Sequence, residues 1–182
     1  MAHNFSFSYT DTFQYKTSGF IDVVVRDVQY WHYGLSESDF NEIVNAPDQN
    51  AIGVILSSVA SDLFGLFIYN TKTKTFQCFN DRSGHNEIYI SRERSNLGYL
   101  VTSDIVNASE LDDDAVHEYL IFHSVLPPNT MYKGVETVPM ASYVNLSQDS
   151  KKISYQRYWN IENTFQPKTN NYKKIVNDLM ST

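Results

Sequence analysis

The stretch Phe64-Gly65-Leu66-Phe67-Ile68-Tyr69 is followed by a polar segment over 70–74, a second strand-like run over 75–80 and the motif Asp81-Arg82-Ser83-Gly84. A third run, Ile88-Tyr89-Ile90, comes shortly after the motif. Short apolar and aromatic runs bounded by polar residues are typical of β-strands. The segment over 70–74 lacks glycine, so we expect a hairpin loop longer than the tight two-residue type. The order strand, turn, strand, Asp-Arg-x-Gly, strand decides the fold that we predict.

Other segments carry strand and helix patterns of their own. Strands are predicted at 5–9, 19–28, 98–102, 132–135, 141–146 and 153–159, with 29–33 as an extension or a hairpin partner of the second and 149–152 as a hairpin tip. Ser36 with Asp39 three residues later predicts a helix N-terminus. The aspartates over 112–114 predict another, because negative charge there favours the helix dipole. Residues 52–56 fit either a buried strand or part of a helix running to Leu63, and periodicity leaves both open.

The chain divides into a main domain and a short C-terminal part. We expect one domain over residues 1–159 and a linker over 160–171, which is rich in Asn, Thr and Gln. Residues 172–180 place apolar side chains at helical spacing for barely two turns. Such a short helix must dock, either on this domain or as the start of a further domain, because short isolated helices are unstable.

Composition narrows the functional class. A net charge of -7 disfavours binding to nucleic acid or to anionic membranes, which requires clustered Lys and Arg. The single cysteine, Cys78, excludes an internal disulfide framework and a cysteine-based zinc site. No apolar run approaches the ~20 residues of a membrane span, and the N-terminus does not resemble a signal peptide. We therefore expect a cytoplasmic protein.

The chain resembles the class II glutamine amidotransferase (glutaminase) domain of the asparagine synthetase-like family. The resemblance holds in order and spacing from about Ala60 to Trp159, and its pieces are 64–69, Asp81-Arg82-Ser83-Gly84, Ile88-Tyr89, 100–104, 111–120, Pro127-Pro128, 130–139 and Tyr158-Trp159. It implies an α+β fold of the N-terminal-nucleophile hydrolase type. That fold is a four-layer α/β/β/α sandwich of two antiparallel sheets.

The chemistry of that family is missing from this sequence. The resemblance implies a cysteine directly after the initiator methionine as nucleophile, an Asn-Gly pair for the oxyanion and an arginine motif for the substrate carboxylate. Ala2 stands at the nucleophile's position, no Asn-Gly pair occurs, and Arg26 lacks the family's neighbours. We therefore predict no catalytic, cofactor-binding or metal-binding residue in this chain.

Other candidate residues have simpler structural interpretations. Asp81, Arg82 and Gly84 could bind a ligand, but an ion pair or turn contact that fixes the loop, with glycine supplying an unusual backbone angle, is the interpretation we favour. Cys78 lies mid-strand and is expected to be buried and inert. The aromatic cluster around Trp31 is expected to belong to a core.

These observations predict a catalytically inactive glutaminase-like scaffold domain of an asparagine synthetase-like ligase. As the resemblance implies, the ligase's ATP and Mg would belong to a synthetase domain, in the same polypeptide or in a partner chain, and a homodimer stays open. Enzymes that resemble this family and lack the cysteine include β-lactam synthetases and lasso-peptide cyclases. Two alternatives remain: a stand-alone binding or interaction module, and an active amidotransferase whose nucleophile has moved to Cys78.

Overall fold

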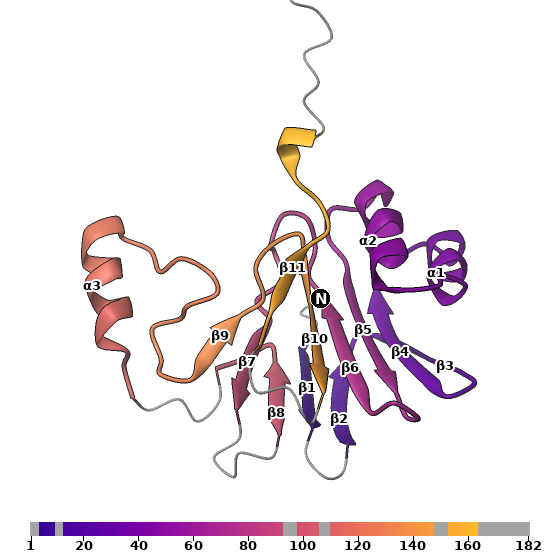
Figure 1. Ribbon diagram of the computed structural model, residues 1–182, viewed down its shortest axis with the longest axis horizontal. Coiled ribbons are helices and arrows are strands. Elements are labelled where there is room, and N and C mark those ends of the chain that lie inside the picture. The colour runs from indigo at the N-terminus through magenta and orange to yellow at the C-terminus, as the bar shows by residue number, and fades with distance from the viewer. Residues whose placement is uncertain (1–3, 10–12, 93–97, 106–109, 148–152, 164–182) are drawn as a thin grey trace, which may run out of the picture.

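The computed structural model describes residues 4–9, 13–92, 98–105, 110–147 and 153–163 (Figure 1). In chain order the elements are β1 (Asn4–Tyr9), β2 (Phe13–Ser18), β3 (Ile21–Val25), β4 (Val28–Tyr33), α1 (Glu37–Val44), α2 (Gln49–Ser58), β5 (Gly65–Asn70), β6 (Thr75–Phe79), β7 (Tyr89–Arg92), β8 (Tyr99–Thr102), α3 (Asp113–Phe122), β9 (Val135–Thr137), β10 (Ser142–Ser147), β11 (Tyr155–Arg157) and the 3-10 turn η1 (Ile161–Asn163).

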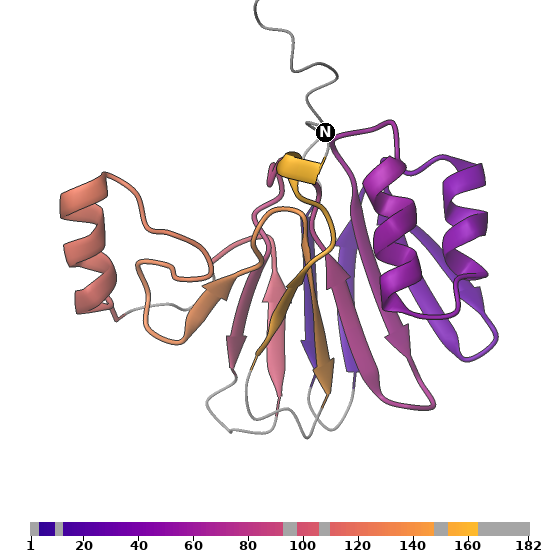
Figure 2. The same cartoon turned by 45° about the horizontal axis from the view of Figure 1, so that its top comes forward.

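The strands form two antiparallel sheets. One has five strands in the order β2-β1-β8-β7-β9, and the other has six in the order β11-β10-β6-β5-β4-β3. Helices α1 and α2 lie together on the six-stranded sheet, whereas α3 lies on the opposite side of the molecule, beyond β9 (Figures 1 and 2). This arrangement confirms the predicted α+β class and the sandwich of two antiparallel sheets.

The central strands β5 and β6 of the six-stranded sheet are buried on both faces because their side chains alternate between two cores. One face supplies Trp31, Phe67 and Phe76 to the core between the sheets, where they meet Phe7 of β1. The other face supplies side chains such as Leu66 to a second core beneath α1 and α2. Two-sided burial explains why β5 reads as a continuous apolar run rather than as an alternating strand.

The two covering helices begin at capping residues. The Ser36 hydroxyl accepts a hydrogen bond from the backbone N–H of Asp39, whose carboxylate in turn accepts one from the backbone N–H of Ser36. This reciprocal capping box confirms the predicted helix start. Asp48 caps α2 in a similar way, through the backbone N–H of Ala51 at 2.8 Å. The ambiguous segment 52–56 lies within α2, which ends at Ser58.

Several local predictions are confirmed and others need correction. The helix start predicted from the aspartates over 112–114 is confirmed, and Asp112 is its N-cap, accepting hydrogen bonds from the backbone N–H groups of Asp114 and Ala115. Residues 29–33 are the hairpin partner of β3, and the β5–β6 loop spans 71–74, longer than the tight type. The hairpin tip over 149–152 and the helix over 172–180 lie outside the described residues.

The corrections concern weakly patterned strands. Strand β2 was not predicted from the sequence, because most of its residues are exposed. It is held in the sheet by pairing with β1 along its whole length. The strand predicted over 153–159 is shorter, because only 155–157 pair with β10 at this sheet edge. The strand predicted around Tyr132 begins instead at Val135, and η1 lies in the predicted linker.

No helix among the described residues is both long and apolar enough to span a bilayer. This finding accords with the absence of a long apolar run in the sequence.

A buried histidine on β4 gives the fold a pH dependence. His32 is 4% exposed, its ring stacks on Phe40 at 4.2 Å, and its Nδ1 atom has no partner among the described residues. Burial lowers the pKa of His32 below its ordinary value because the charged imidazolium is poorly solvated there. The unfolded chain therefore takes up a proton first as the pH falls.

We predict that the free energy of unfolding decreases as the pH falls below about 6.5 and levels off beneath the lowered folded pKa. A His32→Phe variant keeps the aromatic packing and should lose this part of the pH dependence. Urea unfolding of both proteins at about pH 7.5 and about pH 5 measures the difference. An equal pH dependence in the two proteins would contradict the assignment.

Candidate functional site

The Asp81 loop connects β6 to β7 and is organised around a buried carboxylate. Asp81 has no exposed surface. Its Oδ1 atom accepts hydrogen bonds from the backbone N–H groups of Ser83 at 2.9 Å and His85 at 3.1 Å, and its Oδ2 atom accepts one from Asn86 Nδ2 at 2.8 Å. An ionised carboxylate only accepts hydrogen bonds, so a ring of donors satisfies it. The loop therefore takes its shape from Asp81.

Asn86 ties this carboxylate to the strands of the six-stranded sheet. Its amide group also donates to the carbonyl of Phe64 at 2.6 Å, just before β5 begins. Its Oδ1 atom accepts a short hydrogen bond from the hydroxyl of Tyr33, at the end of β4. Burial and, to a smaller extent, the nearby Asp81 charge raise the pKa of the Tyr33 phenol, and they outweigh the opposite effect of the hydrogen bond to Asn86, so the phenol remains a donor at neutral pH.

Asn80 and Tyr158 join the start of the loop to the far end of the chain. The side-chain amide of Asn80 donates to the backbone carbonyl of Val138 at 2.8 Å. The backbone carbonyl of Asn80 accepts a hydrogen bond from the Tyr158 hydroxyl at 2.6 Å. The backbone N–H of Tyr158 donates to the carbonyl of Ala141 at 2.8 Å. Tyr158 also packs on α2 at Gly53, where an added Cβ would lie 2.8 Å from Tyr158 Cβ.

Arg82 turns away from Asp81 and covers the end of α2. Its guanidinium donates to the carbonyls of Ser57 at 3.1 Å and Val59 at 2.8 Å, and it pairs with the Asp62 carboxylate at 2.6 Å. The Cζ atom of Arg82 lies over the Trp159 ring, 6.0 Å from the ring centroid. Carbonyls at a helix C-terminus lack partners within the helix, so a cation there stabilises the end of α2.

Gly84 provides the turn that lets the loop close. Its φ angle is +68°, a left-handed conformation that favours glycine, and an added Cβ would lie 3.0 Å from Met140 Cβ. Asp81, Arg82 and Gly84 thus fix the backbone, as the favoured interpretation held. Of the two contacts that this interpretation allowed, the structure shows the turn contact, because Asp81 binds backbone N–H groups of its own loop and Arg82 pairs with Asp62 outside the motif.

The Asp81 loop lies at the same end of the sandwich as the start of β1. Tyr89, which opens β7, pairs with Thr102 of β8, and Thr102 pairs with Ser6 of β1. The backbone N–H of Ser103 then donates a hydrogen bond to the backbone carbonyl of Phe5 at 3.1 Å. This is the end where the resemblance places a terminal nucleophile, but Ala2 lies outside the described residues.

The remaining candidates have structural roles. Cys78 is fully buried in the core between the sheets, and burial raises the pKa of its thiol far above the ordinary range. Trp31 is likewise fully buried in that core, as predicted. Within the described ranges, no group of three His, Cys, Asp or Glu side chains could hold a metal ion.

Comparison with known proteins agrees with the architecture. Residues 31–159 match a family model described as a glutamine amidotransferase domain, and this span is more than two thirds of the 182 residues. It includes the Asp81 loop and the Tyr158-Trp159 pair that holds it. No curated protein matches the chain.

We predict that Asp81→Asn destabilises the fold by about 1–3 kcal/mol, because the new amide group turns one of the acceptor positions into a donor facing a donor. Asp62→Asn is the matched control. Asp62 is 69% exposed, and an exposed ion pair contributes about 1 kcal/mol or less. Urea unfolding measures both. The structural role of Asp81 would be refuted if the two variants lost the same stability.

Proposed function

Because the chain belongs to the glutamine amidotransferase domain family, we propose that it is a glutaminase-like domain that does not hydrolyse glutamine. In this proposal it is the scaffold for the ATP-dependent half of an asparagine synthetase-like enzyme, which forms an amide or peptide bond. That parent enzyme would be a ligase.

The state of the only thiol carries this proposal. Glutamine hydrolysis through a thioester needs an accessible thiolate. The 182 residues contain one cysteine, and Cys78 has no exposed surface and an inner-core position on β6. Its raised pKa keeps it protonated at neutral pH. This burial also disfavours the alternative in which the nucleophile has moved to Cys78.

The other polar residues of the Asp81 loop support the same conclusion. Asp81 is saturated by donors from its own loop, and Arg82 is engaged by α2 carbonyls and Asp62. Asp81 is fully buried and both terminal nitrogens of Arg82 are engaged, so binding the α-amine or the α-carboxylate of glutamine would require these contacts to break. The sequence also contains no Asn-Gly pair to bind an oxyanion.

A scaffold needs a surface for its partner, and α3 offers one. Leu120, Ile121 and Phe122 are 67%, 69% and 63% exposed, and Leu126 beyond the helix is 55% exposed. Adjacent exposed apolar side chains mark interaction surfaces in many proteins. A synthetase domain in the same polypeptide or in a partner chain would supply ATP and Mg to the ligase reaction.

The same surface favours a second candidate, an interaction module that works without a synthetase domain. The two candidates differ in the native reading frame and its neighbours. A synthetase domain with a Ser-Gly-Gly-x-Asp-Ser loop, encoded with this domain or in an associated chain, supports the scaffold. Isolation of the native protein in complexes without any such domain supports the module.

We predict no release of glutamate from glutamine by this protein and no labelling of native Cys78 by a diazoketone analogue of glutamine. Iodoacetamide should label Cys78 only after the protein is unfolded in urea, which serves as the positive control, and Cys78→Ala gives the labelling blank. If the protein releases glutamate and Cys78→Ala abolishes the release, the alternative in which Cys78 is the nucleophile would be supported. Release that persists in this variant would refute the inactive scaffold.

A further inference from the structure

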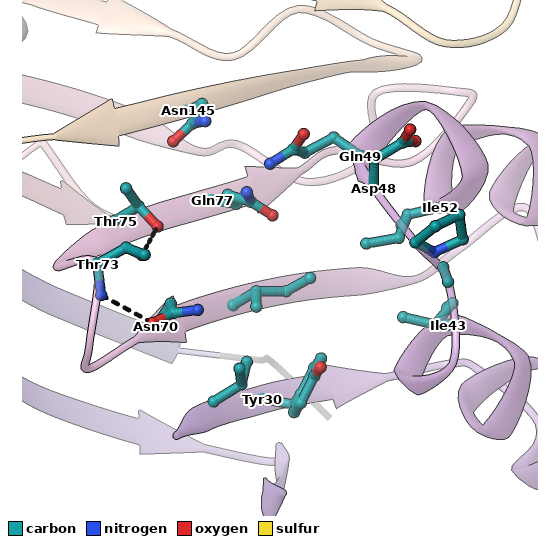
Figure 3. Close-up of a pocket in the computed structure, with 14 residues that line it drawn as sticks. Tyr30, Ile43, Asp48, Gln49, Ile52, Asn70, Thr73, Thr75, Gln77 and Asn145 are labelled. Carbon is teal, nitrogen blue, oxygen red and sulfur yellow. Dashed lines mark hydrogen bonds between the residues drawn. The ribbon is translucent and has the colours of Figure 1, made fainter. Parts of the chain in front are cut away.

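A cleft lined by apolar and uncharged polar side chains opens on the outer face of the six-stranded sheet, where α1 and α2 stop covering it (Figure 3). It has a volume of about 390 Å³, within the range of small-molecule sites. The turn between α1 and α2 forms one wall, through Pro47 and Gln49 among others, and the β5–β6 hairpin forms another, through Thr73. The cleft lies toward the hairpin, whereas the Asp81 loop follows the other end of β6.

The floor of the cleft is a row of paired residues that crosses four strands. Tyr30 pairs with Ile68, Ile68 with Gln77, and Gln77 with Asn145. Residues paired across an antiparallel sheet point to the same face, so these four side chains stand next to one another. A phenol, an aliphatic side chain and two amides are thereby presented in a line.

The polar groups of this row have no partners of their own. Gln77 is only 8% exposed, and the side chains of Gln77, Gln49 and Asn145 make no hydrogen bond with any other part of the described ranges. In Figure 3 the Gln49 amide extends from the helix wall toward Gln77. The amide atoms of Gln77 are not among the buried polar atoms that lack a hydrogen-bond partner, so they are accessible from the cleft although most of the residue is buried. An occupant of the cleft would take the place of solvent on these amides.

The lining selects an uncharged occupant. Asp48 is the only charged residue among those that line the cleft, and its Oδ1 atom already caps α2. No Lys or Arg lines the cleft, so a phosphate or carboxylate would be desolvated there without a counter-charge. Glutamine, with its α-carboxylate, fits poorly for the same reason.

The mixture of amides and apolar surface indicates the kind of ligand. Each Asn or Gln amide offers a donor and an acceptor side by side, which matches a hydroxyl that both donates and accepts. Several separate amides require several hydroxyls on one ligand, whereas a single carboxamide would satisfy only one of them. Val28, Ile52 and Ile68 add an apolar surface suited to the C–H face of a ring.

We propose that this cleft binds a neutral, hydroxyl-rich small molecule, a monosaccharide or a related polyol, with Gln77 as its central contact. The site is remote from the Asp81 loop and uses none of its residues. It therefore stands or falls independently of whether the domain hydrolyses glutamine.

The test is a panel of neutral probes, glucose, galactose, mannose, N-acetylglucosamine and inositol, examined by saturation-transfer NMR and by shifts of the side-chain amide signals of Gln49, Gln77 and Asn145. At least one probe should bind and shift those signals. Gln77→Leu keeps the side-chain size and should weaken the binding of that probe by about tenfold or more. Gln14→Leu is the matched control, because Gln14 is exposed on β2 in the other sheet.

A thermal unfolding curve for each variant shows whether it is folded. If Gln77→Leu fails to fold, Asn145→Ala replaces it, because Asn145 is exposed and lines the same cleft. Failure of every neutral probe to bind, or binding that survives these substitutions, would overturn the proposal. Glucose 6-phosphate is tested last as a charged ligand, because Arg26 and Lys72 line an adjoining cleft and could bind its phosphate. Its binding without that of any neutral sugar would overturn the assignment to an uncharged ligand.

Discussion

The need of one buried carboxylate for hydrogen-bond donors shapes a large part of this domain. Asp81 draws the backbone of its own loop around it and engages Asn86, which in turn reaches Phe64 and Tyr33. Each of these partners begins or ends a strand of the six-stranded sheet or leads into the five-stranded one. A charge without solvent is tolerated only when such a shell is complete. The loop therefore connects strands of both sheets, and this structural role accounts for the presence of the motif in the sequence.

Strong local patterns were predictable from the sequence, and tertiary pairings were not. The capping box at Ser36 and the apolar run of β5 depend on neighbouring residues, so their signals are local. Strand β2 and the brief β11 depend on what they pair with, and their own residues give little sign of it. The motif around Asp81 was recognised, but the ion pair between Arg82 and Asp62 could not be predicted, since that contact exists only after α2 is in place.

The cleft on the sheet shows where a sequence signal was present but ambiguous. Gln77 stands between the apolar residues Phe76 and Cys78 in the middle of a strand, where an amide is unusual. Only the register of β4, β5, β6 and β10 brings it level with Asn145 and Tyr30. A fold associated with one chemistry at one end of its sandwich can thus carry an unrelated recognition surface on its outer face.

The contact between Gly53 and Tyr158 constrains how this chain can diverge. Helix α2 and the residue that follows β11 touch at this point, because Gly53 has no side chain and the Tyr158 side chain occupies the space. Any larger residue at position 53 requires a smaller or displaced one at position 158. That ring also holds the Asn80 carbonyl through its hydroxyl. Across homologues, the residues at these two positions are therefore expected to covary, although they lie far apart in the sequence.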